Sequence, residues 1–115
     1  MAEKSGVEIY ILHNEFEQMD RYIREIEYGI EEEGIPCLTQ KSEIVGYKEL
    51  SIEAANSSRL NVGIGIDKKG NACIRHKNFK EDQFLFEQNI FDKDINLRDL
   101  GINSARLIKG IPFNL

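Results

Sequence analysis

Apolar residues recur along the chain at two different spacings, and the change of spacing marks the expected elements. Residues 7–12 form a dense apolar run, which predicts a strand buried on both faces. After Asn14, a candidate helix cap, apolar residues recur at three- and four-residue steps until Gly34 and Pro36, which are typical helix stop signals. The stripe on this first predicted helix consists of Phe16, Met19, Ile23, Ile26 and Ile30.

The rest of the chain alternates between short strands and helices. Further elements are expected as strands at 35–39 and 60–66, a helix at 47–57, a turn at 67–71, a returning strand at 72–75 and a short strand at 84–86. A last helix opens at Asp94 or Asn96 and stops at Gly110. Strands alternating with helices favour a mostly parallel sheet, which the hairpin makes mixed. We therefore predict an α/β protein, a single three-layer α/β/α domain over residues 1–115.

Composition and charge narrow the function classes. The 115 residues fit one globular domain, with 41% hydrophobic and 30% charged residues. The net charge of -5 repels phosphate backbones and anionic lipids, so nucleic acid and membrane surfaces are excluded as expected partners. No apolar run approaches the roughly 20 residues that span a bilayer. Residues 1–6 lack the apolar core of a signal peptide, and we expect a cytoplasmic protein.

Two glycines in the predicted third strand invite comparison with phosphate-binding loops. Gly63 and Gly65 lack the third glycine of such a motif and lie inside the strand rather than opening a helix. We expect them to allow close backbone packing against a neighbouring element.

Histidines and basic residues give weak signals of a site. His13 and His76 lie at predicted strand ends, where α/β folds place ligands, but no pattern of metal ligands accompanies them, and we expect surface or loop-packing roles. Arg75, His76, Lys77 and Lys80 form a small basic patch, which we interpret as a solvated loop rather than an anion site.

Cysteines and catalytic motifs add no enzyme signature. Cys37 and Cys73 belong to no CxxC pair and are expected to be buried, unpaired thiols. No Ser-His-Asp order, nucleophile elbow or paired carboxylate with a convincing base is evident. This pattern favours a binding role over catalysis.

The acidic run of Glu31, Glu32 and Glu33 lies at the expected end of the first helix. Acids at a helix C-terminus oppose the helix dipole and cost some stability. The run is therefore either a solvated helix end, the interpretation that the residues alone favour, or a binding element for a metal or a basic partner.

Three segments together resemble the small subunit of the diol and glycerol dehydratase reactivases. They are 29–36 (Gly-Ile-Glu-Glu-Glu-Gly-Ile-Pro), 58–67 with its Leu-x-Val-Gly-Ile-Gly core and the following Lys77-Asn78, and 103–113 (Asn-Ser-Ala-Arg-Leu-Ile-Lys-Gly-Ile-Pro-Phe). Their order and spacing match the family over nearly the whole chain. The resemblance implies the fold of the dehydratase medium subunit.

The resemblance also implies a function. Adenosylcobalamin-dependent dehydratases are inactivated during turnover and retain a damaged cobalamin, which the reactivase releases by subunit exchange. Its large subunit is a chaperone-like ATPase that binds ATP and ADP. Its small subunit is non-catalytic, has no cofactor of its own, and assembles with the large subunit as a heterotetramer with two copies of each. A location inside a bacterial microcompartment is compatible with this family.

The resemblance also assigns candidate site residues. In the family a carboxylate of the acidic segment helps to hold Mg or Ca against the large subunit, and oxygen ligands suit both ions. Glu32 is the expected metal ligand, with Glu31 and Glu33 as alternates. Arg106 and Lys109 lie three residues apart on one side of the last helix. Together with Glu31 and Glu32 they are expected at the partner interface, or they complement the negative end of their own helix.

Three other functions stay open. The medium subunit of a dehydratase shares the fold, although a chain of this length favours the reactivase. A small-molecule sensor would need a pocket near His13 and Gly65, and a redox protein would rest on Cys37 and Cys73 alone. The client diol, the stoichiometry, self-dimerisation and encapsulation are not fixed by the sequence.

Overall fold

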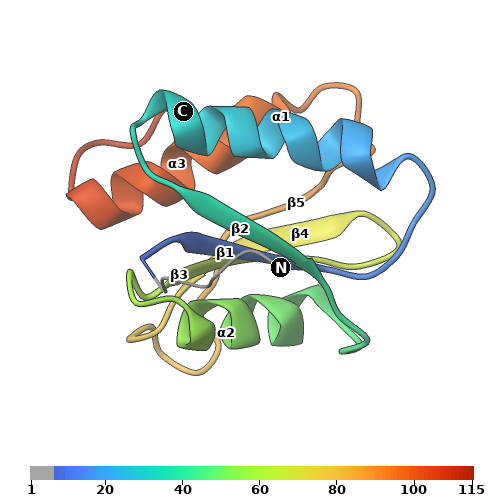
Figure 1. The fold of residues 1–115 in the computed structure, drawn as a ribbon, viewed down its shortest axis with the longest axis horizontal. Coiled ribbons are helices and arrows are strands. Elements are labelled where there is room, and N and C mark those ends of the chain that lie inside the picture. The colour runs from blue at the N-terminus through green and yellow to red at the C-terminus, as the bar shows by residue number, and fades with distance from the viewer. Residues whose placement is uncertain (1–6) are drawn as a thin grey trace.

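The computed structural model describes residues 7–115, and the expectations for residues 1–6 lie outside this range. Strands and helices follow one another along the chain as Figure 1 shows. The elements are β1 (Ile9–His13), α1 (Met19–Glu32), β2 (Cys37–Lys41), α2 (Tyr47–Ser57), β3 (Val62–Ile66), β4 (Asn71–His76), β5 (Leu85–Asn89) and α3 (Leu97–Lys109).

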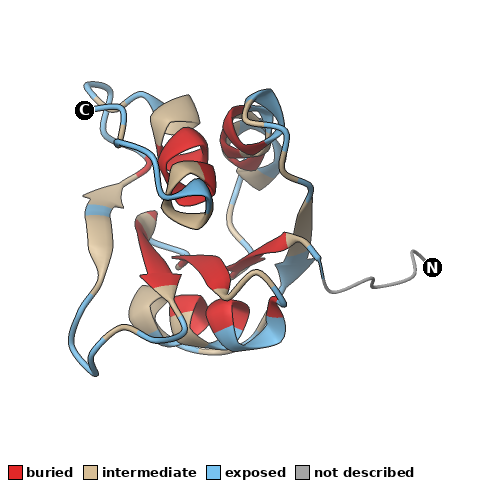
Figure 2. Cartoon of the chain, turned by 90° about the vertical axis from the view of Figure 1, so that its left-hand side faces the viewer, coloured by how far each residue is buried: buried red, intermediate tan, exposed pale blue. Residues whose placement is uncertain are grey.

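One mixed sheet forms the middle of three layers. Its strand order is β2-β1-β3-β4-β5. β1 pairs in parallel with β2 and β3, whereas β4 pairs antiparallel with β3 and β5. Helices α1 and α3 cover one face, and α2 covers the other (Figures 1 and 2). The predicted α/β class and three layers are confirmed, with a larger antiparallel share than the mostly parallel sheet expected.

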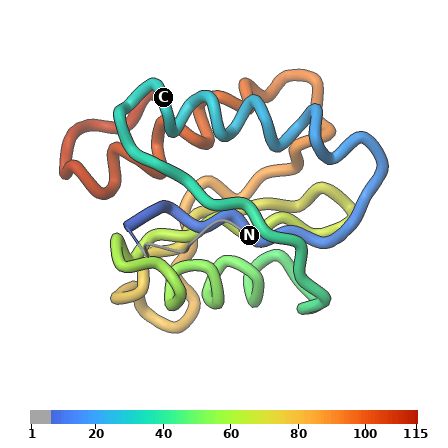
Figure 3. Tube along the Cα trace, in the orientation of Figure 1, coloured from blue at the N-terminus to red at the C-terminus, as the bar shows by residue number. Residues whose placement is uncertain are grey.

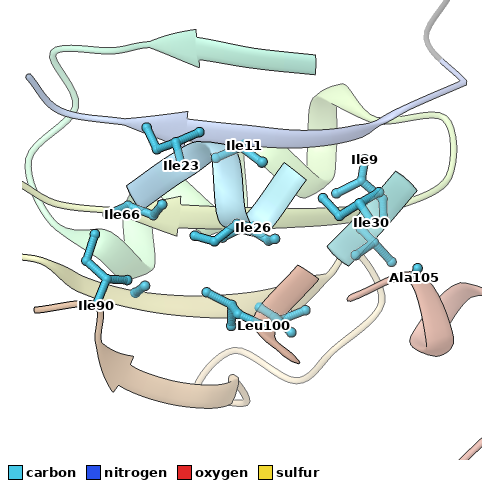
Figure 4. Close-up of a cluster of buried hydrophobic side chains, with 13 residues drawn as sticks. Ile9, Ile11, Ile23, Ile26, Ile30, Ile66, Ile90, Leu100 and Ala105 are labelled. Carbon is cyan, nitrogen blue, oxygen red and sulfur yellow. The ribbon is translucent and has the colours of Figure 1, made fainter. Parts of the chain in front are cut away.

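The main core lies between the sheet and the α1–α3 layer. Ile9, Ile11 and Ile66 of the strands meet Ile26 and the rest of the predicted apolar stripe (Figure 4). Burying aliphatic side chains of this kind stabilises a fold by roughly 1.5–3 kcal/mol each. Phe16 and Met19 pack against the cluster while partly exposed, because the helix begins only at Met19.

Both predicted strand glycines allow α2 to lie directly on the sheet. A Cβ atom at Gly63 would lie 2.3 Å from the backbone nitrogen of Ala55, and one at Gly65 would lie 2.2 Å from the carbonyl oxygen of Tyr47. The small side chain of Ala54, fully buried, completes this contact. The close packing predicted for these glycines is confirmed.

The expected boundaries differ most from the structure at the start of α1, and two strands lie at 37–41 and 85–89 rather than at the expected 35–39 and 84–86. Asn14 does not cap α1, since Gln18 with φ 58° precedes the helix and offers no side-chain cap. The Asn14 amide instead donates to the carbonyl oxygens of Ser42 (3.0 Å) and Ile44 (2.8 Å), tying β1 to the loop before α2. Asn96 does cap α3, accepting from the Arg98 amide at 3.0 Å.

None of the helices in residues 7–115 has the length and apolarity needed to cross a membrane.

Candidate functional site

Helices α1 and α3 lie side by side and bring the two predicted binding segments together (Figure 1). A pair of buried glycines sets their spacing. A Cβ atom at Gly29 would lie 2.1 Å from the Arg98 carbonyl oxygen, and one at Gly101 would lie 2.0 Å from the Ile26 carbonyl oxygen. The backbones are therefore close enough for side chains at the helix surfaces to pair across the groove.

Glu33 joins the acidic run to the predicted basic pair. Its Oε1 accepts from Arg106 Nε at 3.3 Å and from Lys109 Nζ at 3.2 Å. The hydrogen bonds from Arg106 and then Lys109 hold the pKa of the Glu33 carboxyl below its usual value of 4.5. The two cations thus neutralise an acid of the neighbouring helix, an arrangement that neither expectation for Arg106 and Lys109 included.

A second ion-pair group is centred on Arg98, about two turns earlier in α3, and was missed by the sequence-based prediction. Arg98 Nη1 donates to Glu32 Oε1 at 2.8 Å, and Arg98 Nε donates to Glu25 Oε1 at 3.2 Å. The same guanidinium lies 5.4 Å from the ring centre of Tyr28. Arg98 precedes Arg106 by eight residues and so lies on the same side of α3. This spacing could have predicted that both residues belong to one surface.

Glu31 differs from its two neighbours. Its side chain is exposed, and within residues 7–115 its carboxylate makes no hydrogen bond or ion pair. Its negative charge helps to raise the pKa of the Cys37 thiol at the start of β2, with a smaller effect than burial or the charge of Glu27. Glu31 is therefore the acid of the run whose oxygens are available to another molecule.

A complete metal site is not built by the described part of the chain alone. Residues 7–115 contain no group of three or more His, Cys, Asp or Glu side chains placed to hold a metal ion. Oxygen donors such as Glu31 suit Mg or Ca, but one carboxylate does not make a site for either ion.

Comparisons with known proteins identify the family to which this fold belongs. The dehydratase medium subunit family model matches residues 7–114. The propanediol dehydratase-reactivating factor small subunit of Salmonella typhimurium is 39% identical over 89 residues, 77% of this chain and 76% of that protein. The chain belongs to the dehydratase medium subunit family, among the small subunits of the dehydratase-reactivating factors. A probable glycerol dehydratase-reactivating factor small subunit of Citrobacter freundii is 29% identical over 92% of both chains.

Solved structures of reactivating factors share the fold. A glycerol dehydratase reactivase chain superposes with a TM-score of 0.86 and 31% identity, covering 94% of this chain and 96% of its own. A chain of a diol dehydratase-reactivating factor complexed with ADP and Mg2+ gives 0.80 and 36%, covering 93% and 96%. The family resemblance inferred from the three sequence segments is confirmed.

The basic patch expected in this reactivating-factor subunit is not a solvated loop throughout. Arg75 is buried, with 7% exposure, and its Nη1 donates to the carbonyl oxygens of Lys80 (2.7 Å) and Gln83 (2.8 Å). Its Nη2 donates to the carbonyl oxygen of Phe79 at 3.2 Å. The solvated-loop interpretation is wrong for Arg75, because the guanidinium organises the loop from inside.

The two histidines of this subunit serve local structure. The His13 ring is buried at the end of β1, where Nδ1 lies 2.8 Å from the Asn14 carbonyl oxygen. His76 Nδ1 accepts from the Asn78 amide at 3.0 Å. His76 lies at the opposite end of the sheet from His13, beside Val62. The His13 ring does not line the hollow of about 270 Å³ at its own end, which is lined by Asn14, Val45, Gly46, Asp67, Lys68, Lys69 and Asn71. The pocket near His13 and Gly65 that a small-molecule sensor would need is therefore not supported.

Both thiols are free and poorly suited to redox chemistry. Burial, followed by the charges of Glu27 and Glu31, raises the pKa of the Cys37 thiol to about 12. Burial raises the pKa of the Cys73 thiol to about 11. Thiols react as thiolates, so neither cysteine is activated for exchange at neutral pH. Cys73 is fully buried as predicted, whereas Cys37 is partly exposed.

Proposed function

We propose that this chain is the non-catalytic small subunit of a reactivase for adenosylcobalamin-dependent diol or glycerol dehydratases. One observation carries the proposal: the chain matches reactivating-factor small subunits over nearly its whole length, at 31–36% identity to solved structures. The absence of a catalytic constellation in the sequence is consistent with an accessory role. ATP hydrolysis then belongs to the large subunit, and this chain supplies a protein surface.

The proposed mechanism is subunit exchange. Membership of the dehydratase medium subunit family supports this mechanism, because it relates the chain to a component of the dehydratase. A small subunit that leaves the reactivase can occupy the place of that component, loosen the inactivated enzyme and let damaged cobalamin escape. The proposed complex is a heterotetramer with two copies of each subunit, in the cytoplasm or inside a microcompartment.

A reactivation assay tests this function. Inactivated dehydratase is mixed with the large subunit, ATP, Mg and fresh adenosylcobalamin, with and without this chain. We expect recovered dehydratase activity only when both subunits are present. Full recovery with the large subunit alone would overturn the proposal. Recovery without added large subunit would instead indicate a dehydratase component.

The surface around Glu31 is the proposed contact with the large subunit. Glu33 is engaged by Arg106 and Lys109, and Glu32 by Arg98, which leaves Glu31 with free oxygens. Of the three expected metal ligands, Glu31 therefore fits a shared divalent cation better than Glu32, which the family resemblance had favoured. Arg106 and Lys109 then act at the interface by fixing the end of α1 as well as by facing the partner.

Three isosteric variants separate these roles. Glu31→Gln, Glu32→Gln and Glu33→Gln are compared for binding to the large subunit in Mg and in a chelator. We expect Glu31→Gln to remove the dependence on Mg, with Glu33→Gln as the matched control that retains it. Loss of Mg dependence in Glu32→Gln alone would restore the original assignment. Unchanged Mg dependence in all three variants would exclude a metal bridge through this run.

A further inference from the structure

Strand β2 forms one outer edge of the sheet and faces the viewer in Figure 1, where the other strands lie behind it. The tube in Figure 3 follows the chain from the end of α1 into this strand. The parallel ladder with β1 fixes which backbone groups of β2 are used. The Ile9 amide donates to the Pro36 carbonyl oxygen at 3.0 Å, and the Ser42 amide donates to the His13 carbonyl oxygen at 2.8 Å.

In a parallel ladder, successive residues of a strand direct their backbone amide and carbonyl groups alternately toward the paired strand and away from it. Leu38 and Gln40 direct their amide and carbonyl groups toward β1, so Cys37, Thr39 and Lys41 direct theirs away from the sheet. Within residues 7–115, no hydrogen bond reaches the backbone nitrogen or oxygen of these three residues. β2 thus presents a regular edge of unpaired donors and acceptors, which is the geometry that accepts an added strand.

The opposite edge of the sheet is irregular and covered. The β4–β5 register shifts between Ala72 and Ile74, and Phe86 in β5 has φ 53°. The ring of Phe113, from the segment after α3, packs on Phe86 with centroids 5.1 Å apart. The side-chain amide of Asn103 holds that segment by two hydrogen bonds to the Asn114 backbone, at 3.0 and 2.7 Å. Protection of β5 and not of β2 indicates that the β2 edge has another use.

Two carboxylates of α1 lie near the open edge of β2. Glu27 of α1 accepts a hydrogen bond from the Thr39 hydroxyl at 2.6 Å, directly above the middle of β2. Glu31 follows one turn later on the same side of α1. The nearest described cation on the strand, Lys41, lies at its end and pairs with Glu15 at 3.6 Å. The middle of the edge therefore carries negative charge that an incoming strand must match.

This charge decides between two occupants. A second copy pairing its own β2 antiparallel, with the two-fold axis at Thr39, would bring two Glu27 carboxylates to that axis, and like charges directly opposite are destabilising. A strand with a basic side chain at that position would gain a charge-assisted hydrogen bond instead. We infer that β2 receives an extended segment of the large subunit by strand addition, with Lys or Arg opposite Glu27. This inference rests on the proposed reactivase function.

Thr39→Pro tests the backbone pairing. Proline removes the outward amide of Thr39 and obstructs an incoming strand, while every ladder bond to β1 remains. Thr39→Val is the matched control, because it loses the same hydrogen bond to Glu27 but keeps the amide. We expect Thr39→Pro to bind the large subunit at least about tenfold more weakly than Thr39→Val, as loss of one interfacial hydrogen bond or more implies. Equal affinity of the two variants would overturn strand addition.

Hydrogen exchange of the unsubstituted chain supplies a second measurement that does not depend on the folding of a proline variant. We expect the amides of Cys37, Thr39 and Lys41 to exchange rapidly in the free chain and to be protected in the complex. Protection elsewhere with none on β2 would overturn the inference while leaving the reactivase function intact. Failure of the unsubstituted chain to bind the large subunit would overturn both.

Glu27→Gln tests the basic partner residue. The substitution should weaken binding more at low than at high salt, and an unchanged salt dependence would reject that residue.

Discussion

Helices α1 and α3 are joined by two contacts of different physical character. Where the two helices touch, Gly29 and Gly101 let the two backbones approach until no side chain fits between them. At the surface, Glu33 pairs with Arg106 and Lys109, and Arg98 pairs with Glu25 and Glu32. The first contact requires residues without a side chain, and the second consists of ion pairs between partly exposed side chains.

The difference separates what builds this subunit from what it offers to a partner. Close-packed backbone contacts cannot be rearranged without moving whole elements. Exposed ion pairs contribute little to stability and are weakened by salt. The surface acids and bases can therefore vary at small cost to the fold, as the proposed role in binding a large subunit requires.

The largest effect is expected from adding one methyl group to the glycine contact. In Gly101→Ala the new Cβ atom would lie 2.0 Å from the Ile26 carbonyl oxygen, so the helices must separate. Overpacking of this kind costs about 2–3 kcal/mol, which a denaturant titration measures as a lower free energy of unfolding.

Gly34→Ala is the control for this substitution. Its Cβ atom would meet nothing within 4 Å, so the only penalty is the strained backbone at φ +78°. If Gly101→Ala were no more destabilising than Gly34→Ala, the contact would be looser than described.

A buried cation should matter more than a partly exposed one of the same type. Arg75→Met leaves the carbonyl oxygens of Phe79, Lys80 and Gln83 without their shared donor. Hydrogen bonds to a charged group contribute about 1.5–3 kcal/mol, so we expect a loss of about 2 kcal/mol and faster amide exchange in residues 77–84. Arg106→Met is the matched substitution at the surface, and a greater loss there than in Arg75→Met would contradict the comparison.

Neutralising the acid of the surface contact should have a smaller effect on stability. Glu33→Gln keeps the size of the side chain and removes the charge that Arg106 and Lys109 neutralise. We expect a small decrease in melting temperature at low salt that shrinks as salt is added. A decrease as large as that of Gly101→Ala would show that the ion pairs hold the helices together.

The smallest effect is the dependence of this contribution on pH. Because the folded pKa of Glu33 is depressed, the stabilisation is present in full above the ordinary value of 4.5 and is lost as the pH falls through the folded pKa. The melting temperatures of the unsubstituted chain and Glu33→Gln should therefore converge in acid. A difference that persists at low pH would assign the effect of the substitution to something other than charge.

The sequence predicted those features that depend on local pattern. Helix α2, the β3–β4 hairpin and the Asn96 cap were predicted because their signals lie within a few residues of one another. Asn14 was assigned as a helix cap in error, since its amide bonds the loop before α2, which is distant in sequence.

The site was predicted only as separate segments. The acids at 31–33 and the bases at 106 and 109 could be identified, but their pairing depends on the packing of α1 against α3. The distinction between Glu31 and Glu32 depends on Arg98, and the role of Arg75 depends on carbonyl oxygens of a folded loop. None of these contacts has a signature in spacing along one element.

Native mass spectrometry of this chain co-expressed with the large reactivase subunit tests the central claim most directly. The account predicts a stable complex with two copies of each subunit, which forms in Mg and weakens in a chelator. Absence of that complex, together with assembly of this chain with a dehydratase large subunit into a cobalamin-binding enzyme, would contradict it.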